Sequence, residues 1–342
     1  MVTLGFHASH EQISPRQLLK DVQHAEQAGF DAAMCSDHIE PWSARQGHSG
    51  FAWSWLGAAL ATTGLRFGVV TAPGQRYHPA IIAHASATLA AMFPGRFWMA
   101  PGSGENMNEH VTGDAWPPKE TRQQRLEECV DIIRRLHRGE DVTHHGLVTV
   151  EQARIWDVPE PPPPLIGPAI SVETARRAAD WADGLVTVNQ PPEKLKHMLA
   201  AYRDNGGQGK AVLQVHLSWA PREADALAVA LDQWRTNTFA PPVPWDLPTA
   251  AHFDGVSNHI GEEQVRKSVN ISASLDRHAE WLAGYAALGF DELYLHFVGQ
   301  HQAPFIDAFA AEVLPQLRPD PVPAPAALPR ASAAPSPAEA RP

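Results

Sequence analysis

The sequence predicts an α/β protein with the architecture of a (β/α)8 TIM barrel. Strand-like apolar runs alternate with helix-like segments along almost the whole chain of 342 residues. Eight strand-like segments are each followed by a helix, and a barrel suits this repeat better than an open sheet because the last strand can pair with the first. A doubly wound open sheet is the alternative. Residues 1–318 have the length of one barrel with insertions.

The strands are identified as short apolar runs that end in turn-forming residues. They cover residues 2–7, 30–35, 65–71, 96–100, 165–167, 184–188, 211–220 and 292–298. The helices are identified by amphipathic spacing, and the first has Ser14 as its expected N-cap and Gly29 as its stop. They cover residues 15–28, 51–63, 79–93, 119–138, 171–181, 192–205, 222–236, 275–288 and 304–317.

Three segments do not fit the repeat. Residues 142–150, around His144-His145-Gly146, are typical of a small hairpin, and residues 239–258 indicate an irregular insertion. In residues 319–342, 16 of 24 positions are Pro or Ala. Such a segment buries too little apolar surface to offset its ordering entropy, so we expect a disordered tail outside the barrel domain.

Composition excludes several classes of protein. The net charge of −11, without any basic stripe, argues against a nucleic-acid partner. Cys35 and Cys129 are too few for a disulfide framework and fit a reducing compartment. No signal peptide is recognisable, and the apolar stretches are shorter than the roughly 20 residues of a membrane helix. We therefore expect a soluble, cytoplasmic protein that binds neither nucleic acid nor membrane.

Titratable residues follow directly after several of the predicted strands. Functional residues of a barrel lie on the loops after the strands, at the carboxyl face. The run 30–35 ends in Ser36-Asp37-His38, with Trp42 four residues beyond His38, and the run 96–100 is followed by Gly102-Ser103-Gly104-Glu105. The residues that the barrel places at this face are His7, Asp37, His38, Thr71, Glu105 and Asn108.

These residue types are suited to acid–base chemistry beside a flat organic ligand. His38 is a candidate general base whose pKa or tautomer a nearby carboxylate such as Asp37 can set. The alternative is that Asp37 caps the loop and His38 only packs. Glu105 is a candidate acid, and the preceding glycines would let the backbone approach a bulky ligand. The alternative is an ordinary helix-entry turn.

Other signals are weaker. Trp42 could stack on a ring or simply pack, and Ser171 either caps its helix or helps that helix bind a phosphate. The glycine-rich turn is not a dinucleotide fingerprint, because Met107 stands where the third glycine would be. The chain has no His-x-His pair, G-x-S-x-G elbow or P-loop, and we expect no metal site.

Five motifs together suggest a family. They are Gly5-Phe6-His7-Ala8-Ser9, Ser36-Asp37-His38 with Pro41-Trp42, Arg76-Tyr77-His78-Pro79-Ala80, Gly102-Ser103-Gly104-Glu105 with Asn108-Glu109, and Asp183-Gly184. In this set the chain resembles the luciferase-like barrel superfamily of flavin- and deazaflavin-dependent oxidoreductases. It is most similar to the branch that contains the coenzyme F420-dependent glucose-6-phosphate dehydrogenases.

The resemblance implies a flavin-type ring, of FMN or coenzyme F420, over the carboxyl face of the barrel. By the same resemblance His38 is the base, Glu105 donates a proton to the cofactor and Trp42 stabilises the reaction. It also implies a non-proline cis peptide bond at Val69-Val70. The positions that match cofactor-binding residues are Asp37, Val69, Val70, Thr71, Gly104, Asn108, Ala169, Ile170 and Ser171.

The substrate site departs from the sugar-phosphate enzymes of that branch. Lys194 and Lys267 match two of their phosphate-binding lysines, whereas the third cation, an Arg, falls at about Ala303. His7 stands where the branch has a Lys after its first strand. Fewer cations hold a phosphomonoester less firmly, so we expect His7, Lys194 and Lys267 to bind a substrate other than a sugar phosphate.

The expected activity is hydride transfer to or from a small alcohol or carbonyl compound. One alternative is an FMN-dependent monooxygenase that uses O2 and reduced flavin from a partner flavin reductase. An alternative of another class is a flavin-binding barrel without catalysis. A homodimer is common in the superfamily, although no interface can be derived from these residues.

Overall fold

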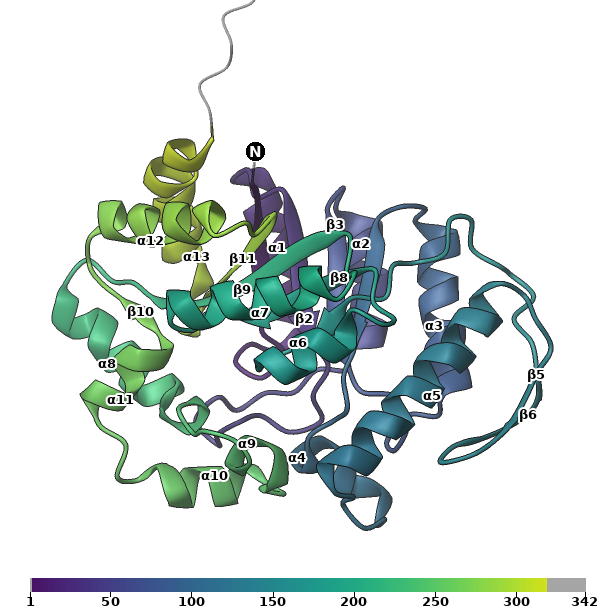
Figure 1. The fold of residues 1–342 in the computed structure, drawn as a ribbon. Helices are drawn as coiled ribbons and strands as arrows, with labels where there is room; N and C mark the ends of the chain where they lie inside the picture. The colour runs from purple at the N-terminus through teal and green to yellow at the C-terminus, as the bar shows by residue number, and fades with distance from the viewer. Residues whose placement is uncertain (1, 319–342) are drawn as a thin grey trace, which may run out of the picture.

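The computed structural model describes residues 2–318, in which parallel strands form a nearly closed barrel (Figure 1). The strands pair in the order β4-β3-β2-β1-β11-β9-β8-β7. Their bounds are β1 (Thr3–Ala8), β2 (Ala32–Ser36), β3 (Arg66–Thr71), β4 (Phe97–Pro101), β7 (Gly167–Pro168), β8 (Gly184–Val188), β9 (Lys210–Ser218) and β11 (Glu292–Phe297). The predicted (β/α)8 architecture is thereby confirmed.

Two junctions close the barrel. The first strand pairs with the last, with Thr3 opposite Glu292. Near β7 the closure is looser: the Met99 N–H donates to the Pro164 carbonyl at 3.1 Å, and the Ile166 N–H donates to the Met99 carbonyl at 2.8 Å. The carboxyl ends of all eight strands consequently meet at one face.

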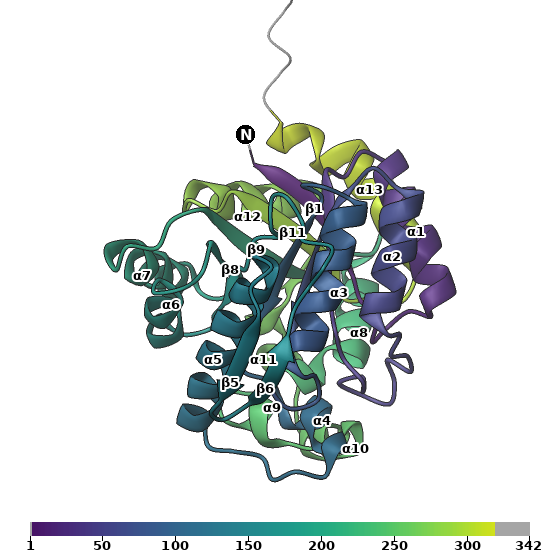
Figure 2. The ribbon, with the colours of Figure 1, turned by 90° about the vertical axis from the view of Figure 1, so that its right-hand side faces the viewer.

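Helices surround the barrel (Figures 1 and 2). The helix that begins at Pro15 has no side-chain cap from Ser14, contrary to expectation, but it does end before Gly29, whose φ is +99°. The helices are α1 (Pro15–Gln27), α2 (Ala52–Thr62), α3 (Pro79–Met92), α5 (Lys119–His137), α6 (Val172–Ala178), α7 (Pro192–Asp204), α8 (Glu223–Gln233), α12 (Leu275–Ala287) and α13 (Gln302–Ala308). Shorter helical turns are His110–Thr112, Arg235–Asn237, Phe309–Val313 and Pro315–Leu317.

Most of the inserted segments cover the carboxyl face, which is at the bottom of Figure 1, whereas the hairpin lies at the side of the barrel next to α5. The predicted hairpin is confirmed as β5 (Val142–His145) and β6 (Thr149–Ala153). Residues 239–258 are more regular than expected, because the Thr249 side chain accepts from the His252 N–H and caps a helix that the surrounding prolines obscure in the sequence. The covering elements are α4 (Asn106–Glu109), α9 (Val243–Asp246), α10 (Ala250–Ser257) and α11 (Glu262–Ser268), with β10 (Asn270–Ile271) added beside β9.

Two further expectations concern a cis peptide bond and a disordered tail. The peptide bond Val69–Val70 is not cis, and the cis bonds of the described residues precede Pro161 and Pro242. The expectation was wrong because Val69 and Val70 keep an unbroken register with both β2 and β4, so the strand has no bulge there. The predicted tail, residues 319–342, lies outside the described residues. Within residues 2–318, no helix has the length and apolarity needed to cross a membrane.

The barrel interior is filled where large rings lie over glycines. The Trp98 and Tyr294 rings meet edge to face with centroids 6.0 Å apart. A Cβ atom on Gly68 would lie 2.0 Å from the Trp98 ring, and one on Gly5 would lie 2.3 Å from the Tyr294 ring. These glycines therefore leave the space that the two rings occupy.

Gly68→Ala is expected to destabilise the fold by about 1–3 kcal/mol, because the added methyl group displaces the Trp98 ring in a packed interior. Urea unfolding measures this change. The matched control is Gly57→Ala in α2, where no described atom lies within 4 Å of the new Cβ. That substitution is expected to stabilise by about 0.4–1 kcal/mol. Equal effects of the two substitutions would contradict the packing argument.

Candidate active site

A cavity of about 1010 Å³ opens at the carboxyl face of the barrel. Its size suits a large organic ligand. The predicted site residues that line it are Asp37, His38, Trp42, Val70, Thr71, Gly104, Glu105, Asn108, Ala169, Ile170, Ser171, Lys194 and Lys267. The structure thus brings together residues from the loops after most of the strands.

Two of the predicted site residues, His7 and Val69, do not line the cavity. Val69 is fully buried in the core between strands and helices, because neighbouring side chains of a strand point to opposite faces. His7 lies behind the cavity wall, stacked on His296 with ring centroids 4.2 Å apart. Its two ring nitrogens have no hydrogen-bond partner within the described residues.

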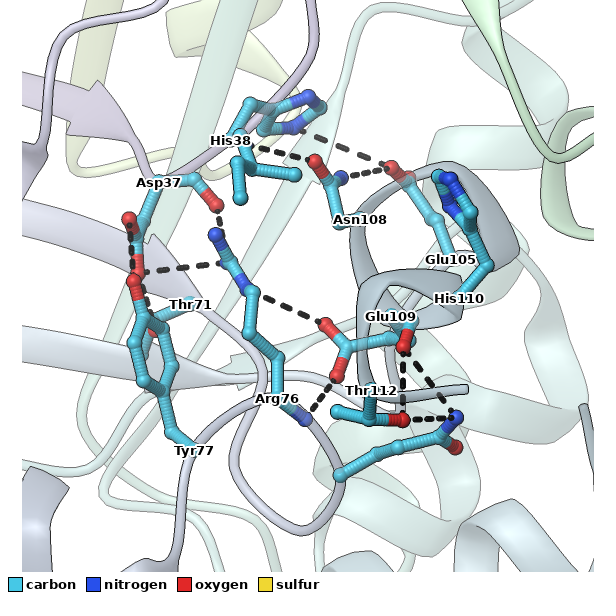
Figure 3. A network of polar contacts seen from close by, with 12 residues as sticks. Asp37, His38, Thr71, Arg76, Tyr77, Glu105, Asn108, Glu109, His110 and Thr112 are labelled. Carbon is cyan, nitrogen blue, oxygen red and sulfur yellow. Dashed lines mark hydrogen bonds and ion pairs between the residues drawn. The ribbon is translucent and has the colours of Figure 1, made fainter. Parts of the chain in front are cut away.

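His38 lies between two carboxylates. Its Nδ1 atom is 3.7 Å from Oε1 of Glu11, and its Nε2 atom is 3.8 Å from Oε2 of Glu105, as Figure 3 shows for the second pair. Glu11 follows β1 and had not been singled out from the sequence, although its place after a strand end is the signal used for the other residues. Nε2 faces the cavity, whereas Nδ1 is buried.

Burial shifts the pKa values of His38, Glu105 and Glu11. It lowers the pKa of His38 to about 4, with the charge of Arg76 acting in the same direction. Burial raises the pKa of Glu105 to about 8, and the nearby Glu11 and Glu109 add to the effect. The pKa of Glu11 is raised to about 7, again mainly by burial. At neutral pH the structure therefore holds a neutral imidazole beside a protonated Glu105, and not an ion pair.

The exposed part of the Glu105 side chain faces the cavity. Its side chain is 29% exposed, while the His38 side chain is 12% exposed. Both groups are therefore accessible to a ligand in the cavity. This combination of a titratable pair with shifted pKa values in a cleft is typical of a catalytic site.

Asp37 does not contact the His38 ring; its carboxylate is turned to the opposite side, as the left of Figure 3 shows. It accepts hydrogen bonds from Thr71 Oγ1 at 2.9 Å, Tyr77 Oη at 3.2 Å and Trp53 Nε1 at 3.2 Å. Asp37 influences His38 only through its charge, which tends to raise the pKa of the imidazole.

Arg76 joins the two halves of the site. Its Nη2 atom donates to the Asp37 carbonyl at 2.8 Å and lies 3.6 Å from the Asp37 carboxylate. Its backbone N–H donates to Glu109 at 2.6 Å, and its Nε atom lies 3.7 Å from the same carboxylate. One buried guanidinium thus holds the loop after β2 against α4.

Asn108 holds Glu105 in place. Its Oδ1 atom accepts from the Ile39 N–H at 2.9 Å, and its Nδ2 atom donates to Oε2 of Glu105 at 3.3 Å (Figure 3). Gly104 precedes Glu105 with a φ of +85°, and a Cβ atom there would lie 3.0 Å from the Glu109 side chain. The positive φ and the close contact with Glu109 therefore require a glycine at this position, whether or not a ligand is bound.

Trp42 forms part of the wall next to His38. The two ring centroids are 5.3 Å apart, and the opposite side of the indole meets Phe253 of α10 edge to face at 5.2 Å. The indole therefore connects the catalytic loop to the insertion that covers the barrel.

Polar and cationic groups lie at the rim of the cavity. Lys194 and Lys267 both line it, and Nζ of Lys267 is already paired with Glu263 at 2.7 Å. Elsewhere on the lining Ser171 caps α6, its hydroxyl accepting from the Thr174 N–H at 3.2 Å. Arg177 also lines the cavity, and its guanidinium is paired with Glu120 at 2.9 Å. Among residues 2–318 no group of three His, Cys, Asp or Glu residues is arranged to hold a metal ion.

Comparison with known proteins places this arrangement in a family. A family model described as luciferase-like monooxygenase matches residues 1–292. A protein of Beutenbergia cavernae named F420-dependent glucose-6-phosphate dehydrogenase is 34% identical over 93% of this chain and 98% of its own length. The protein of that name in Microbacterium testaceum is also 34% identical, over 92% and 97% of the two chains.

Solved structures agree with this result. An F420-dependent secondary alcohol dehydrogenase, in complex with an F420-acetone adduct, superposes with a TM-score of 0.86 and 26% identity over 93% of this chain and 99% of the other. A coenzyme F420-dependent tetrahydromethanopterin reductase from Methanopyrus kandleri shares the fold, with a TM-score of 0.73 and 16% identity over 93% and 99%. The chain belongs to the luciferase-like monooxygenase family of oxidoreductases.

Proposed function

We propose that this protein is a coenzyme F420-dependent dehydrogenase that transfers hydride between its cofactor and a small alcohol or carbonyl compound. The observation that carries the proposal is the neutral His38 beside the protonated Glu105, with 3.8 Å between the two side chains at the cavity. A base and an acid in these states match the two proton transfers that alcohol oxidation requires.

The residues of the cavity fit such a cofactor. Its volume of about 1010 Å³ has room for a ring system together with a substrate. We infer that Val70, Gly104 and Asn108 hold the ring, and that Ala169, Ile170 and Ser171 receive its phosphate. The relatives named for F420, at 34% identity over nearly the whole chain, favour F420 over FMN.

His38 acts as the base in the proposed reaction. Because its Nδ1 is buried beside Glu11, the basic atom is Nε2, which faces the cavity. When Nε2 removes the proton of the substrate hydroxyl, the imidazole becomes cationic between two carboxyl groups. The ionised form of Glu11, whose pKa lies near 7, stabilises the imidazolium.

Glu105 acts as the acid. When bound, the cofactor supplies the hydride chemistry. Glu105 would hold the proton that the bound cofactor needs, and the hydrogen bond from Asn108 keeps its carboxyl group in position. Trp42 closes the wall over His38 and excludes water from the reacting atoms. For a carbonyl substrate the same two residues work in the reverse direction.

The substrate is proposed to be a neutral alcohol or carbonyl compound and not a sugar phosphate. Lys194 and Lys267 are available at the cavity, but one of them is already paired with Glu263. Two cations, one of them shared, hold a phosphomonoester less firmly than a three-cation cluster.

An FMN-dependent monooxygenase is the second candidate, because the matching family model carries that description. It would need O2 and a flavin reductase as a partner, which the dehydrogenase does not. A flavin-binding barrel without catalysis is less favoured, because it has no use for the shifted pKa values of His38 and Glu105.

The choice of cofactor is tested by titrating the purified protein with F420 and with FMN while following ring fluorescence. We expect micromolar binding of F420, weaker binding of FMN, and reduction of F420 by a secondary alcohol without oxygen. Binding of FMN alone, with product formed only in the presence of O2, would establish the monooxygenase instead.

His38→Ala is expected to lower kcat/KM by about 10²–10⁴-fold, because the substrate proton loses its acceptor. The Kd of F420 should stay close to that of the wild type. His84→Ala, on the exposed side of α3, is the control and should leave both quantities unchanged. Turnover that survives in His38→Ala would remove this residue from the mechanism.

The pH dependence of alcohol oxidation follows from the two pKa values. kcat/KM should rise as His38 loses its proton near pH 4 and fall as Glu105 ionises near pH 8. Glu105→Gln should lower the plateau and abolish the alkaline decline. Glu11→Gln should keep an alkaline decline but move it to lower pH, because the charge of Glu11 contributes to the raised pKa of Glu105. An alkaline decline that persists unchanged in Glu105→Gln would show that another group causes it.

A further inference from the structure

A set of uncharged side chains lines the cavity in addition to the residues of the proposed reaction. It consists of Gln214 and His216 of β9, His296 of β11 and Trp234, all of which line the cavity. Gln214 is 8% exposed, His296 3% and Trp234 4%. We refer to these four residues as the neutral floor.

A chain of hydrogen bonds fixes the orientation of the neutral floor. Gln12 Nε2 donates to the Val298 carbonyl, so its Oε1 atom is the acceptor that faces His296 Nε2 at 2.8 Å. His296 therefore carries its proton on Nε2, and its Nδ1 atom is an acceptor. Gln214 Nε2 lies 3.0 Å from that Nδ1 atom and 3.1 Å from His216 Nε2.

The His216 ring also forms a hydrogen bond to the Ser268 backbone, which assigns its proton to Nδ1 and leaves Nε2 as an acceptor. Both N–H groups of Gln214 are then occupied. Its Oε1 atom has no hydrogen-bond partner among residues 2–318, yet it is not buried, so it is open to the cavity that the residue lines. A carboxamide oxygen is an acceptor without charge. The neutral floor thus presents one oriented acceptor to a ligand.

The surroundings keep that acceptor rigid and uncharged. The His296 ring is packed against His7 on one side and meets Trp234 edge to face at a centroid distance of 4.8 Å. Trp234 also contacts His216 at 4.7 Å. Burial lowers the pKa of His216 to about 3, so both hydrogen-bonded imidazoles stay neutral at physiological pH.

We propose that Gln214 is a specificity-determining residue whose Oε1 atom accepts a hydrogen bond from a second hydroxyl group of the substrate. The preferred substrate is then an uncharged diol or polyol, oxidised at one hydroxyl beside His38 and recognised at another by Gln214. This inference rests on the proposed function, because it names the substrate class of the same site.

The expected discrimination is moderate. An alkyl group in place of the second hydroxyl leaves Oε1 of Gln214 without a donor, which weakens binding by about tenfold for a typical hydrogen bond. The loss is smaller than in a sealed pocket, because the oxygen faces an open cavity that water can enter.

The test compares isosteric alcohols that bind to the full-length, F420-loaded protein. Dissociation constants are measured by saturation-transfer NMR for propane-1,2-diol against butan-2-ol and for butane-1,3-diol against pentan-2-ol. For at least one pair the wild type should bind the diol about tenfold more tightly. Gln214→Leu should abolish this preference, and Gln214→Met provides a second, unbranched replacement.

The control is His84→Ala on the exposed side of α3, which leaves Gln12, His296 and Gln214 in place. It should retain the preference for the diol, and thermal unfolding verifies that each variant is folded. Equal affinities in the wild type, or a preference that survives in both Gln214 variants, would overturn the inference. Turnover is measured separately: preference without turnover contradicts the proposed dehydrogenase, whereas turnover without preference contradicts only the role of Gln214.

Discussion

Desolvation of the His38–Glu105 pair is the constraint on which the rest of the site depends. In water an imidazole and a carboxyl group at this distance would form an ion pair and be useless as base and acid together. Burial disfavours both charged forms, so the imidazole stays unprotonated and the carboxyl group keeps its proton. The barrel supplies this burial by bringing the ends of β1, β2 and β4 to one face.

A network of buried ion pairs holds the loops that carry His38 and Glu105 in position. Arg76 is itself buried, and it contacts both Asp37 and Glu109, so that its one positive charge lies between two carboxylates. Removing Arg76 leaves two buried carboxylates without their cation, which is costly in a protein interior. Asp37 and Glu109 therefore hold the loops of the site in position. His38, next to Asp37, and Glu105, four residues before Glu109, take no part in these ion pairs and face the cavity.

The sequence was sufficient for the strands and for the face that carries the site, because apolar runs ending in polar residues are local signals. It could not reveal which neighbours touch. Asp37 precedes His38 but points to Arg76, since successive side chains diverge at a strand end. Glu11 approaches His38 only through closure of the barrel, a non-local event. Val69 was misplaced because alternation within a strand decides between cavity and core, and a resemblance does not report it. His7 is on the inner face of its strand, but its ring is buried against His296.

The central claim is that Glu105 is a neutral acid at physiological pH while His38 is a neutral base. Infrared difference spectroscopy of the cofactor-loaded protein tests it directly, by comparing wild type with Glu105→Gln across a pH titration. We predict a protonated carboxylic-acid C=O band at pH 7 that is absent from the variant and disappears with a midpoint near pH 8. A carboxylate band at pH 7, with no protonated form above about pH 5, the ordinary range for a Glu, would contradict the account.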